Sequence, residues 1–265
     1  MAYRELLPHP ALQPFVDRFW ILTAAAGAGP RRILPDGCID VIVDVDPDSD
    51  GCGQAAAVGT MTRAMLFHPQ TRVRSAAVRF RPGGAAPFLR LPADALTDRV
   101  VEVGDADARW IAPGDGDVPP DPVAAVAMLE RRLLARLRAI AGLDHAVAHA
   151  VGRLFSPAPP TIDELGREIG WSRQHLARRF RTAVGVGPKQ LARVARLQRA
   201  VDHLQRGAGS PRARVFNLAG AAADLGYFDQ AHMARDFREL AGLAPRDIRA
   251  ARGSIFPIRS LLQAP

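Results

Sequence analysis

Residues 165–188 read LGREIGWSRQHLARRFRTAVGVGP, and residues 221–245 read AAADLGYFDQAHMARDFRELAGLAP. Aligned with each other, the two stretches match at positions that lie 57 residues apart. The matched positions are Ser172, Leu176, Arg178, Phe180, Gly185 and Pro188 in the first copy, and Asp229, Met233, Arg235, Phe237, Gly242 and Pro245 in the second. Upstream the offset is 56, so the second copy has one extra residue between Tyr227 and Asp229. The repeat predicts two copies of one supersecondary unit.

The first copy has the local signals of two helices joined by a tight turn. Thr161 followed by Glu164 is a capping-box pattern, which satisfies free backbone N–H groups at a helix start. Gly170 suits the left-handed position that ends a helix, and Ser172 suits the cap of the next helix. These signals predict a helix-turn-helix unit.

The second copy repeats the signals with different side chains. Asn217 and Asp229 are the expected N-caps, and Gly226 is the expected stop between the helices. Met233 and Phe237 lie four residues apart and share the inward face of the second helix, as their counterparts do in the first copy. The sequence therefore predicts a second helix-turn-helix.

A stripe of aliphatic residues between the copies predicts one long connecting helix. The stripe consists of Leu191, Val194, Leu197, Val201 and Leu204. Such a helix would hold the two units at a fixed separation. A separation of about 34 Å lets both second helices enter successive major grooves on one face of DNA.

The second helix of each copy has an outward face that suits DNA. In the major groove Arg bonds guanine, Gln bonds adenine, and Ala is small enough to touch a thymine methyl group. Further Arg side chains and the helix N-termini can hold phosphates. The candidate DNA-binding residues are Ser172, Arg173, Gln174, Ala177, Arg178 and Arg181 in the first copy, and Phe228, Asp229, Gln230, Ala231, His232 and Arg235 in the second.

Residues 144–252 resemble the DNA-binding domain of the AraC/XylS family of transcription regulators. The resemblance is carried by the stretch LGYFDQAH at residues 225–232 and continues through Phe237, Gly242 and Pro245 to Ile248-Arg249. It implies two helix-turn-helix units joined by a helix and bound to an asymmetric promoter site. It places base reading on Gln174, Ala177 and Arg178, and on Gln230, Ala231 and Arg235 with His232 as a further candidate.

Two small residues and one loop depart from the family pattern. Gly166 stands where family members usually carry Ala, and Ala221 stands where a larger aliphatic residue is usual. Both changes predict looser packing, because fewer methylene groups are buried. The loop at 206–214 is longer than typical, which predicts a less rigid spacing of the two units.

The charge of the chain is unevenly distributed. Residues 1–143 contain 16 basic and 17 acidic residues, whereas residues 144–265 contain 19 basic and 10 acidic residues. The net charge is therefore −1 in the first part and +9 in the second. This asymmetry favours a polyanionic partner for the C-terminal part and another role for the N-terminal part.

The composition of the first 110 residues is typical of a β-rich domain. Val16–Leu22, Cys38–Val45 and Arg72–Phe80 are rich in β-branched and aromatic residues and are separated by Pro, Gly and Asp. Ala85–Leu91 is a candidate short helix. Further on, aliphatic residues at helical spacing from Val126 to Leu137 predict an amphipathic helix, and Asp144–Phe155 predicts another.

These patterns predict a multidomain chain. A β-rich α+β domain of barrel-like form comes first, and an all-α domain with two helix-turn-helix units joined by a long helix follows. The expected divisions are a sensor-like domain at 1–110, a linker and amphipathic helix at 111–143 suited to dimerisation or interdomain contact, the DNA-binding domain at 144–255 and a tail at 256–265.

The first part also resembles the sensor-like domains of some AraC-type regulators. The resemblance rests on Phe19-Trp20, on LPDGCID at residues 34–40 and on FRPGG at residues 80–84. It implies a small-molecule effector or dimerisation, without assigning a ligand. Trp20, Phe80 and Phe88 are candidates either to line a pocket or to fill the core, and the core is the commoner role of such aromatic residues.

Two constellations raise the question of a metal. Residues 46–51 begin like a calcium-binding loop, but Ala57 occupies the position of the essential Glu, and Pro47 interrupts the pattern. A solvated turn between strands is the favoured interpretation. His145 and His149 share a helix face without a third ligand. We therefore expect no metal and no cofactor.

Cys38 supports an alternative function, in which its thiolate takes up an alkyl group or an oxidant and thereby switches DNA binding. A reactive thiolate needs nearby cations, and Asp36 and Asp40 oppose Arg31 and Arg32. A small buried residue is the favoured interpretation of Cys38.

A non-specific architectural DNA protein is the third hypothesis for the function of the chain. The chain has no nucleophile elbow, Walker loop or dinucleotide fingerprint, so we do not expect an enzyme.

The leading prediction is an effector-responsive transcription regulator. Its expected partners are double-stranded promoter DNA, RNA polymerase, a small-molecule effector and a second copy of the chain in a homodimer. The uncharged stretch Phe19–Pro30 is too short to span a bilayer and lies behind Glu5 and Asp17, unlike a signal peptide. We therefore expect a cytoplasmic protein without a membrane partner.

Overall fold

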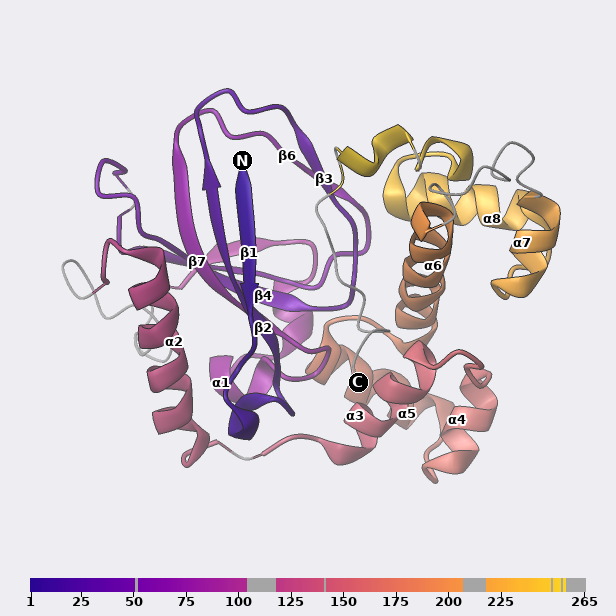
Figure 1. Cartoon of the computed structure of the whole chain (residues 1–265). Coiled ribbons are helices and arrows are strands. Elements are labelled where there is room, and N and C mark those ends of the chain that lie inside the picture. The colour runs from indigo at the N-terminus through magenta and orange to yellow at the C-terminus, as the bar shows by residue number, and fades with distance from the viewer. Residues whose placement is uncertain are drawn as a thin grey trace.

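The computed structural model describes residues 1–50, 52–103, 118–140, 142–206, 218–248, 250–253 and 255. Within these ranges a β-sheet part is followed by a helical part, and the two lie side by side (Figure 1). The predicted Asn217 cap, the tail at 256–265, residues 111–117 of the expected linker and residues 207–214 of the long loop lie outside the described residues. In the described part of the chain, no helix combines the length and the hydropathy needed to cross a membrane.

The N-terminal part is built on a six-stranded antiparallel sheet. Across the sheet the order is β1 (Ala2–Leu6), β2 (Val16–Ala24), β7 (Val73–Phe80), β4 (Ile39–Asp44), β5 (Ala55–Val58) and β8 (Val100–Glu102). A separate two-stranded ribbon pairs β3 (Arg31–Ile33) with β6 (Met65–Phe67). The predicted β-rich class is confirmed. Among the described strands the large sheet remains open, with β1 and β8 at its edges, and does not close into a barrel.

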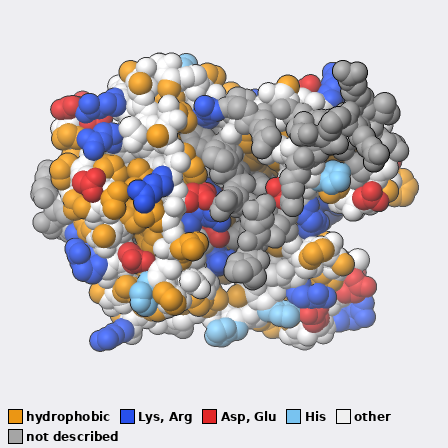
Figure 2. All heavy atoms as spheres, viewed as in Figure 1, with side chains coloured by type: hydrophobic (Ala, Val, Ile, Leu, Met, Phe, Trp, Pro, Cys, Tyr) orange, Lys and Arg blue, Asp and Glu red, His pale blue; other side chains and the backbone are white. Residues whose placement is uncertain are grey.

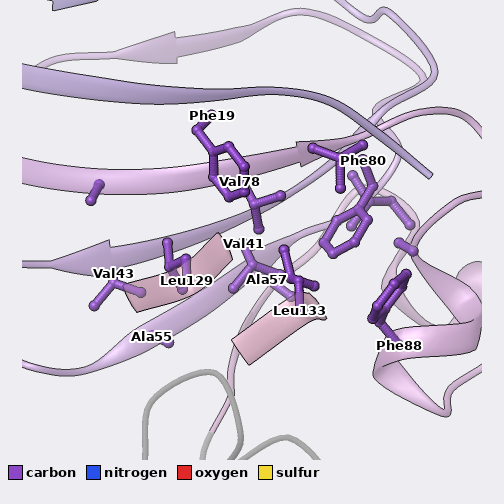
Figure 3. Close-up of a cluster of buried hydrophobic side chains, with 14 of the residues drawn as sticks. Phe19, Val41, Val43, Ala55, Ala57, Val78, Phe80, Phe88, Leu129 and Leu133 are labelled. Carbon is purple, nitrogen blue, oxygen red and sulfur yellow. The ribbon is translucent and has the colours of Figure 1, made fainter. Parts of the chain in front are cut away.

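One face of the sheet carries the main hydrophobic core. Because side chains alternate along a strand, Phe19, Val41 and Val78 all point to this face (Figure 3). It is covered by α2 (Pro122–Leu137), whose Leu129 and Leu133 are buried among the strand residues. The predicted amphipathic helix therefore packs on the sheet of its own N-terminal part.

Three short helices close the end of this core: η1 (Pro10–Leu12), α1 (Ala86–Leu89) and η2 (Ala93–Leu96). Phe88 of α1 is fully buried beside Phe80, with 5.5 Å between the ring centroids. Both rings therefore fill the core. Trp20 points to the opposite face, where a smaller cluster with Leu22 and Ala77 contacts Phe67 of the ribbon. The three aromatic residues considered at the sequence level do not line a common pocket.

The C-terminal part consists of helices in the predicted order. They are α3 (His145–Phe155), α4 (Ile162–Glu168), α5 (Arg173–Val184), α6 (Pro188–Arg206), α7 (Leu218–Asp224), α8 (Gln230–Asp236), η5 (Phe237–Ala241), η6 (Pro245–Asp247) and η7 (Ala250–Gly253). Helices α4 and α5 form the first helix-turn-helix, and α7 and α8 form the second. The long helix α6 runs from one unit to the other (Figure 1).

Each helix-turn-helix has its own buried cluster. Leu176 and Phe180 are fully buried in the first, and Met233 and Phe237 are fully buried in the second, as the repeat predicts. Leu34, which follows β3 of the ribbon, belongs to the second cluster and is 1% exposed. The N-terminal part therefore completes the core of the second unit.

Gly166 corrects one expectation. A Cβ added there would lie 2.9 Å from the carbonyl oxygen of Trp171, which is closer than side chains normally approach. The same turn is closed by the Trp171 N–H, which donates to the Gly166 carbonyl at 2.8 Å. The glycine permits this close turn, so the predicted loosening was wrong at this position. The side chain of Ala221 lies outside the described residues.

We predict that Gly166→Ala lowers the free energy of unfolding by about 1 kcal/mol, because crowding of about 1–3 kcal/mol exceeds a gain in helix propensity of about 1 kcal/mol. Gly152→Ala in α3 is the matched control, since a Cβ there meets nothing within 4 Å. It should raise the stability by about 1 kcal/mol. Urea unfolding of both variants measures the difference. Equal stabilisation by both substitutions would contradict the close approach at Gly166.

Candidate nucleic-acid interface

Helix α5 presents the candidate residues of the first unit. The Ser172 hydroxyl accepts a hydrogen bond at 3.2 Å from the third backbone N–H of the helix, which confirms the predicted cap. The exposed residues are Arg173, Gln174, Arg178 and Arg181, with Ala177 half-buried among them. The Arg173 guanidinium forms a bidentate ion pair with Asp163 of α4. That pair turns Arg173 toward its own unit.

Helix α8 presents the candidate residues of the second unit. Asp229 Oδ1 accepts the backbone N–H of His232 at 2.6 Å, so this predicted cap is also confirmed. Gln230, Ala231 and Arg235 are exposed. Phe228 is the residue that the one-residue insertion adds, and it is 91% exposed just before the helix begins. A large, exposed aromatic side chain therefore lies at the N-terminus of α8 and has no counterpart in the first unit.

A histidine packs against an aromatic ring at equivalent places in both units. His232 contacts the ring of Tyr227 edge-on at 5.4 Å between centroids, and His175 contacts Trp171 at 4.7 Å. His232 also accepts the Phe228 N–H at 3.3 Å. Its position in the family motif thus has a structural role in the turn. His175 was missed at the sequence level, although the 57-residue offset from His232 identifies it.

Helix α8 is braced against α6 by a buried carboxylate. Asp236 is 3% exposed and accepts hydrogen bonds at 2.8 Å from both Arg193 and Arg196. Burial opposes ionisation of this carboxyl group, but the hydrogen bonds from Arg196 and Arg193 outweigh it and hold the pKa of Asp236 below its usual value. At the equivalent position of α5 stands Arg179, which pairs with Asp144, the N-cap of α3. We call α5 and α8, the second helix of each unit, the recognition helices. An acidic side chain ties α8 to α6, whereas a basic side chain ties α5 to the start of α3.

The N-terminal part bonds the C-terminal ends of both recognition helices. At the end of α5, Thr60 Oγ1 donates to the Val184 carbonyl and Thr97 Oγ1 donates to the Gly185 carbonyl at 2.7 Å. At the end of η5, which continues α8, the Ala64 N–H donates to the Leu240 carbonyl at 2.7 Å and Arg32 donates to the Ala241 carbonyl at 3.1 Å. The last carbonyl groups of a helix lack partners inside it. Here those partners come from the N-terminal part, and the bonded carbonyls of Val184 and Ala241 are equivalent positions of the repeat.

Gly185 and Gly242 make these contacts sterically accessible. Both have left-handed backbone angles, with φ of 94° and 64°. A Cβ on Gly185 would lie 2.9 Å from Thr97 Oγ1, and a Cβ on Gly242 would lie 2.7 Å from the guanidinium of Arg32. The repeated glycines thus end the recognition helices and also admit the N-terminal donors.

The family comparisons fit the two parts separately. A model described as a helix-turn-helix domain matches residues 165–251, a range that contains both recognition helices. This region is an AraC-type helix-turn-helix domain. It makes the chain a DNA-binding transcription regulator. A second model, for a domain of unknown function (DUF6597), matches residues 4–102, which contain the ribbon, strands β2, β4, β5, β7 and β8, and most of β1.

Solved structures give looser likenesses. A transcriptional regulator from Chromobacterium violaceum with an AraC-type DNA-binding domain is 24% identical, with 40% of this chain and 88% of that chain covered and a TM-score of 0.33. ToxT from Vibrio cholerae is 8% identical, with 94% and 98% covered and a TM-score of 0.41. A ToxT structure bound to (E)-4-(8-methylnaphthalen-1-yl)but-3-enoic acid is 10% identical, with 94% and 99% covered and a TM-score of 0.41. Comparison with curated proteins gives no match.

Ion pairs lower the positive charge that the first AraC-type unit offers to a phosphate. Acidic and basic side chains alternate over α4 and α5 (Figure 2). Arg173 faces Asp163 of this unit, and Arg179 faces Asp144 at the start of α3. Arg178 and Arg181, which are exposed on the same helix, therefore carry the positive charge best placed to meet DNA.

The constellations considered for metals have other roles. Asp46 lies between β4 and β5 as expected, but it is 2% exposed and accepts a hydrogen bond at 2.7 Å from Arg72, so the turn is not fully solvated. His149 contacts Glu168 at 2.7 Å on an exposed face of α3. Within the described ranges, His, Cys, Asp and Glu side chains form no group of three that could hold a metal ion.

The environment of Cys38 does not favour thiolate chemistry. The side chain is 4% exposed and its backbone N–H donates to Asp36 at 2.9 Å. Burial, with the nearby charge of Asp36 as the next contribution, raises the pKa of Cys38 well above its ordinary value. The group is thereby held as a thiol, which is the poor nucleophile of the two forms.

We predict that native protein treated with N-ethylmaleimide is modified at Cys52 and not at Cys38. Cys52 is partly exposed, whereas Cys38 is shielded from the reagent and protonated. Mass spectrometry of proteolytic fragments measures the two sites, and labelling in urea is the control that both thiols are competent. Rapid native labelling of Cys38 would restore the cysteine-sensor hypothesis.

We also predict that Asp236→Asn destabilises the protein by on the order of 3 kcal/mol, because two arginines lose a buried charged partner. Since folding lowers the pKa of Asp236, its contribution is complete above the unfolded-state value of about 3.9 and is lost as the pH falls below it. Urea unfolding at neutral and acidic pH measures both effects.

The matched control is Glu239→Gln. Glu239 pairs with the same Arg193 but its side chain is 64% exposed, so the cost should stay below about 1 kcal/mol. Equal losses in the two variants would show that burial of the Asp236 carboxylate does not determine its contribution.

Proposed function

We propose that the chain binds an asymmetric promoter site sequence-specifically, with α5 and α8 in successive major grooves. The observation that carries this proposal is the repeat itself. Two recognition helices stand at opposite ends of α6, each capped at its start and each with an exposed outward face (Figure 1). The proposal requires that the two recognition helices lie about one helical turn of DNA apart, about 34 Å.

The two faces share the equivalent Arg178 and Arg235 and differ in the side chains around them, which defines the asymmetry. Gln174, Ala177 and Arg178 are proposed to read bases from α5, and Gln230, Ala231 and Arg235 from α8. Ser172 and Arg181 are proposed to contact the backbone of the DNA. Arg173, paired with Asp163, and Asp229, the cap of α8, are proposed to hold the two recognition helices in position, with His232 supporting the turn. Phe228 is proposed to contact the sugar or a base edge, because an exposed aromatic ring at a helix start gains from burial against DNA.

We further propose that the N-terminal part modulates DNA binding in response to a small molecule. The direct hydrogen bonds from this part to both recognition helices support the proposal, and ToxT provides a case of an AraC-architecture protein with a bound organic acid. A homodimer and a contact with RNA polymerase complete the proposed mode of action. Because its proposed target is chromosomal DNA, we propose that the protein acts in the cytoplasm. We also propose that it activates transcription, as members of the AraC/XylS family do.

The prediction for α5 and α8 concerns Arg178→Ala and Arg235→Ala. Each should cost about 1–3 kcal/mol on the preferred site and relax sequence preference at the base that it reads. Selection of sites from a random DNA pool, followed by titration of the winner and of mismatched versions, measures both effects. An unchanged site preference in both variants would refute base reading by these helices.

Arg179→Ala is the control on the same helix as Arg178, because Arg179 is exposed but engaged with Asp144. It should leave the selected site unchanged. A non-specific architectural protein instead predicts similar affinity for all sequences and a steep dependence on salt. The pool selection therefore separates the two functions.

A further inference from the structure

A cavity of about 110 Å³ lies between the six-stranded sheet and the β3–β6 ribbon. Trp20 and Ile42 line it from the sheet, and Ile33, Met65 and Phe67 line it from the ribbon. It is on the opposite face of the sheet from the main core of Figure 3. We call this space the ribbon cavity.

The polar groups of the ribbon cavity neutralise one another. Arg79 donates to Asp40 at 3.2 Å and lies 3.8 Å from Asp36, while Trp20 Nε1 donates to the same Asp40 at 2.6 Å. An ionic ligand would have to break these bonds. Tyr3 also lines the cavity and its hydroxyl donates to Glu5 at 3.1 Å, while the other walls are mostly aromatic and aliphatic. An apolar cavity of about 150 Å³ in another protein accepts benzene. The chemistry therefore suits a compact, neutral and mostly apolar molecule.

Three pairs of adjacent residues connect the ribbon cavity with the AraC-type domain. In each pair one residue lines the cavity and its neighbour bonds the end of a recognition helix. The pairs are Ile33 with Arg32, Met61 with Thr60, and Met65 with Ala64. Leu34, next to Ile33, is buried in the core of the second unit. Figure 1 shows the ribbon between the large sheet and the end of the second unit.

We propose that the ribbon cavity binds a compact, neutral, mostly apolar molecule. We further propose that its occupation stabilises the contacts that the ribbon makes with the end of η5, and that Thr60, in the segment between β5 and β6, makes with the end of α5. The signalling role of this site rests on the proposed regulator function, whereas its occupation and its mechanical coupling do not. We call the ribbon closed when it makes these contacts. A ligand that binds only when the ribbon is closed increases the population of that closed state. Thr60, Ala64 and Arg32 then hold the recognition helices for a larger fraction of the time.

Fluorobenzene is the probe for occupation, because it is among the smallest neutral aromatic molecules and fluorine NMR reports its binding to the full chain. We expect saturable binding that Ile42→Trp and Met65→Trp abolish, since each adds a ring to the cavity. Val100→Trp is the matched control, because Val100 on β8 is 61% exposed. Thermal unfolding verifies that each variant is folded. Absence of binding to the wild type, or binding that survives both folded filling variants, would overturn the site.

Amide hydrogen exchange tests the coupling. The Ala64 N–H is bonded to the Leu240 carbonyl, so its exchange reports directly on the ribbon contact. At a probe concentration of about ten times the dissociation constant, exchange at Ala64 should slow by about tenfold if only the closed ribbon binds. Amides in α4, which is remote from the ribbon, should be unaffected. Binding without slower exchange at Ala64 would overturn the coupling.

These measurements use no DNA. A chain that binds fluorobenzene and protects Ala64 but selects no DNA site would refute the proposed regulator function and leave the cavity standing. A chain that selects a DNA site but fails the probe experiment would refute the cavity alone. The two failures are thus distinguishable.

Discussion

The two recognition helices end on hydrogen-bond donors that belong to another part of the chain. A buried carbonyl without a partner costs about 1–3 kcal/mol, so the donors from Thr60, Thr97, Arg32 and Ala64 are a strong constraint on where the helices can lie. With Leu34 inserted in the second core, this constraint is apolar as well as polar. The N-terminal part and the AraC-type domain therefore behave as one packed body, in which the orientation of each recognition helix depends on the same sheet and ribbon.

Within that body, the two units are similar in fold and different in bracing. The buried Asp236 binds two arginines of α6, so α8 is tied to the connecting helix. Its counterpart Arg179 binds the N-cap of α3, so α5 is tied to the segment that precedes the first unit. Because the braces differ, substitutions that tune one unit need not alter the other. This independence suits a protein whose two reading faces differ.

Features encoded within a few residues could be predicted from the sequence. The Thr161–Glu164 capping box follows from residue spacing, and strands β2, β4 and β7 follow from their β-branched and aromatic residues. The structure contains all of them. Features that depend on distant partners could not. Gly166 looks like a defect until the Trp171 carbonyl is placed beside it, and Leu34 looks like a loop residue until the second core surrounds it. The bond from Gln198 to the Pro35 carbonyl joins residues 163 apart, a distance at which sequence spacing has no predictive value.

The N-terminal part contacts both helix-turn-helix units, so it can control their relative orientation and not only one unit. DNA presents its successive major grooves at a fixed spacing of about 34 Å, and two linked reading helices gain affinity from simultaneous binding only when their geometry matches that spacing. A rearrangement of the sheet or ribbon acts on the ends of α5 and η5 together, and hence on the angle between the units. Each unit can keep its own base contacts while the pair loses its fit to the double site. A change in the angle between the units therefore alters the affinity gained from binding both major grooves at once. The sequence preference of each recognition helix stays the same.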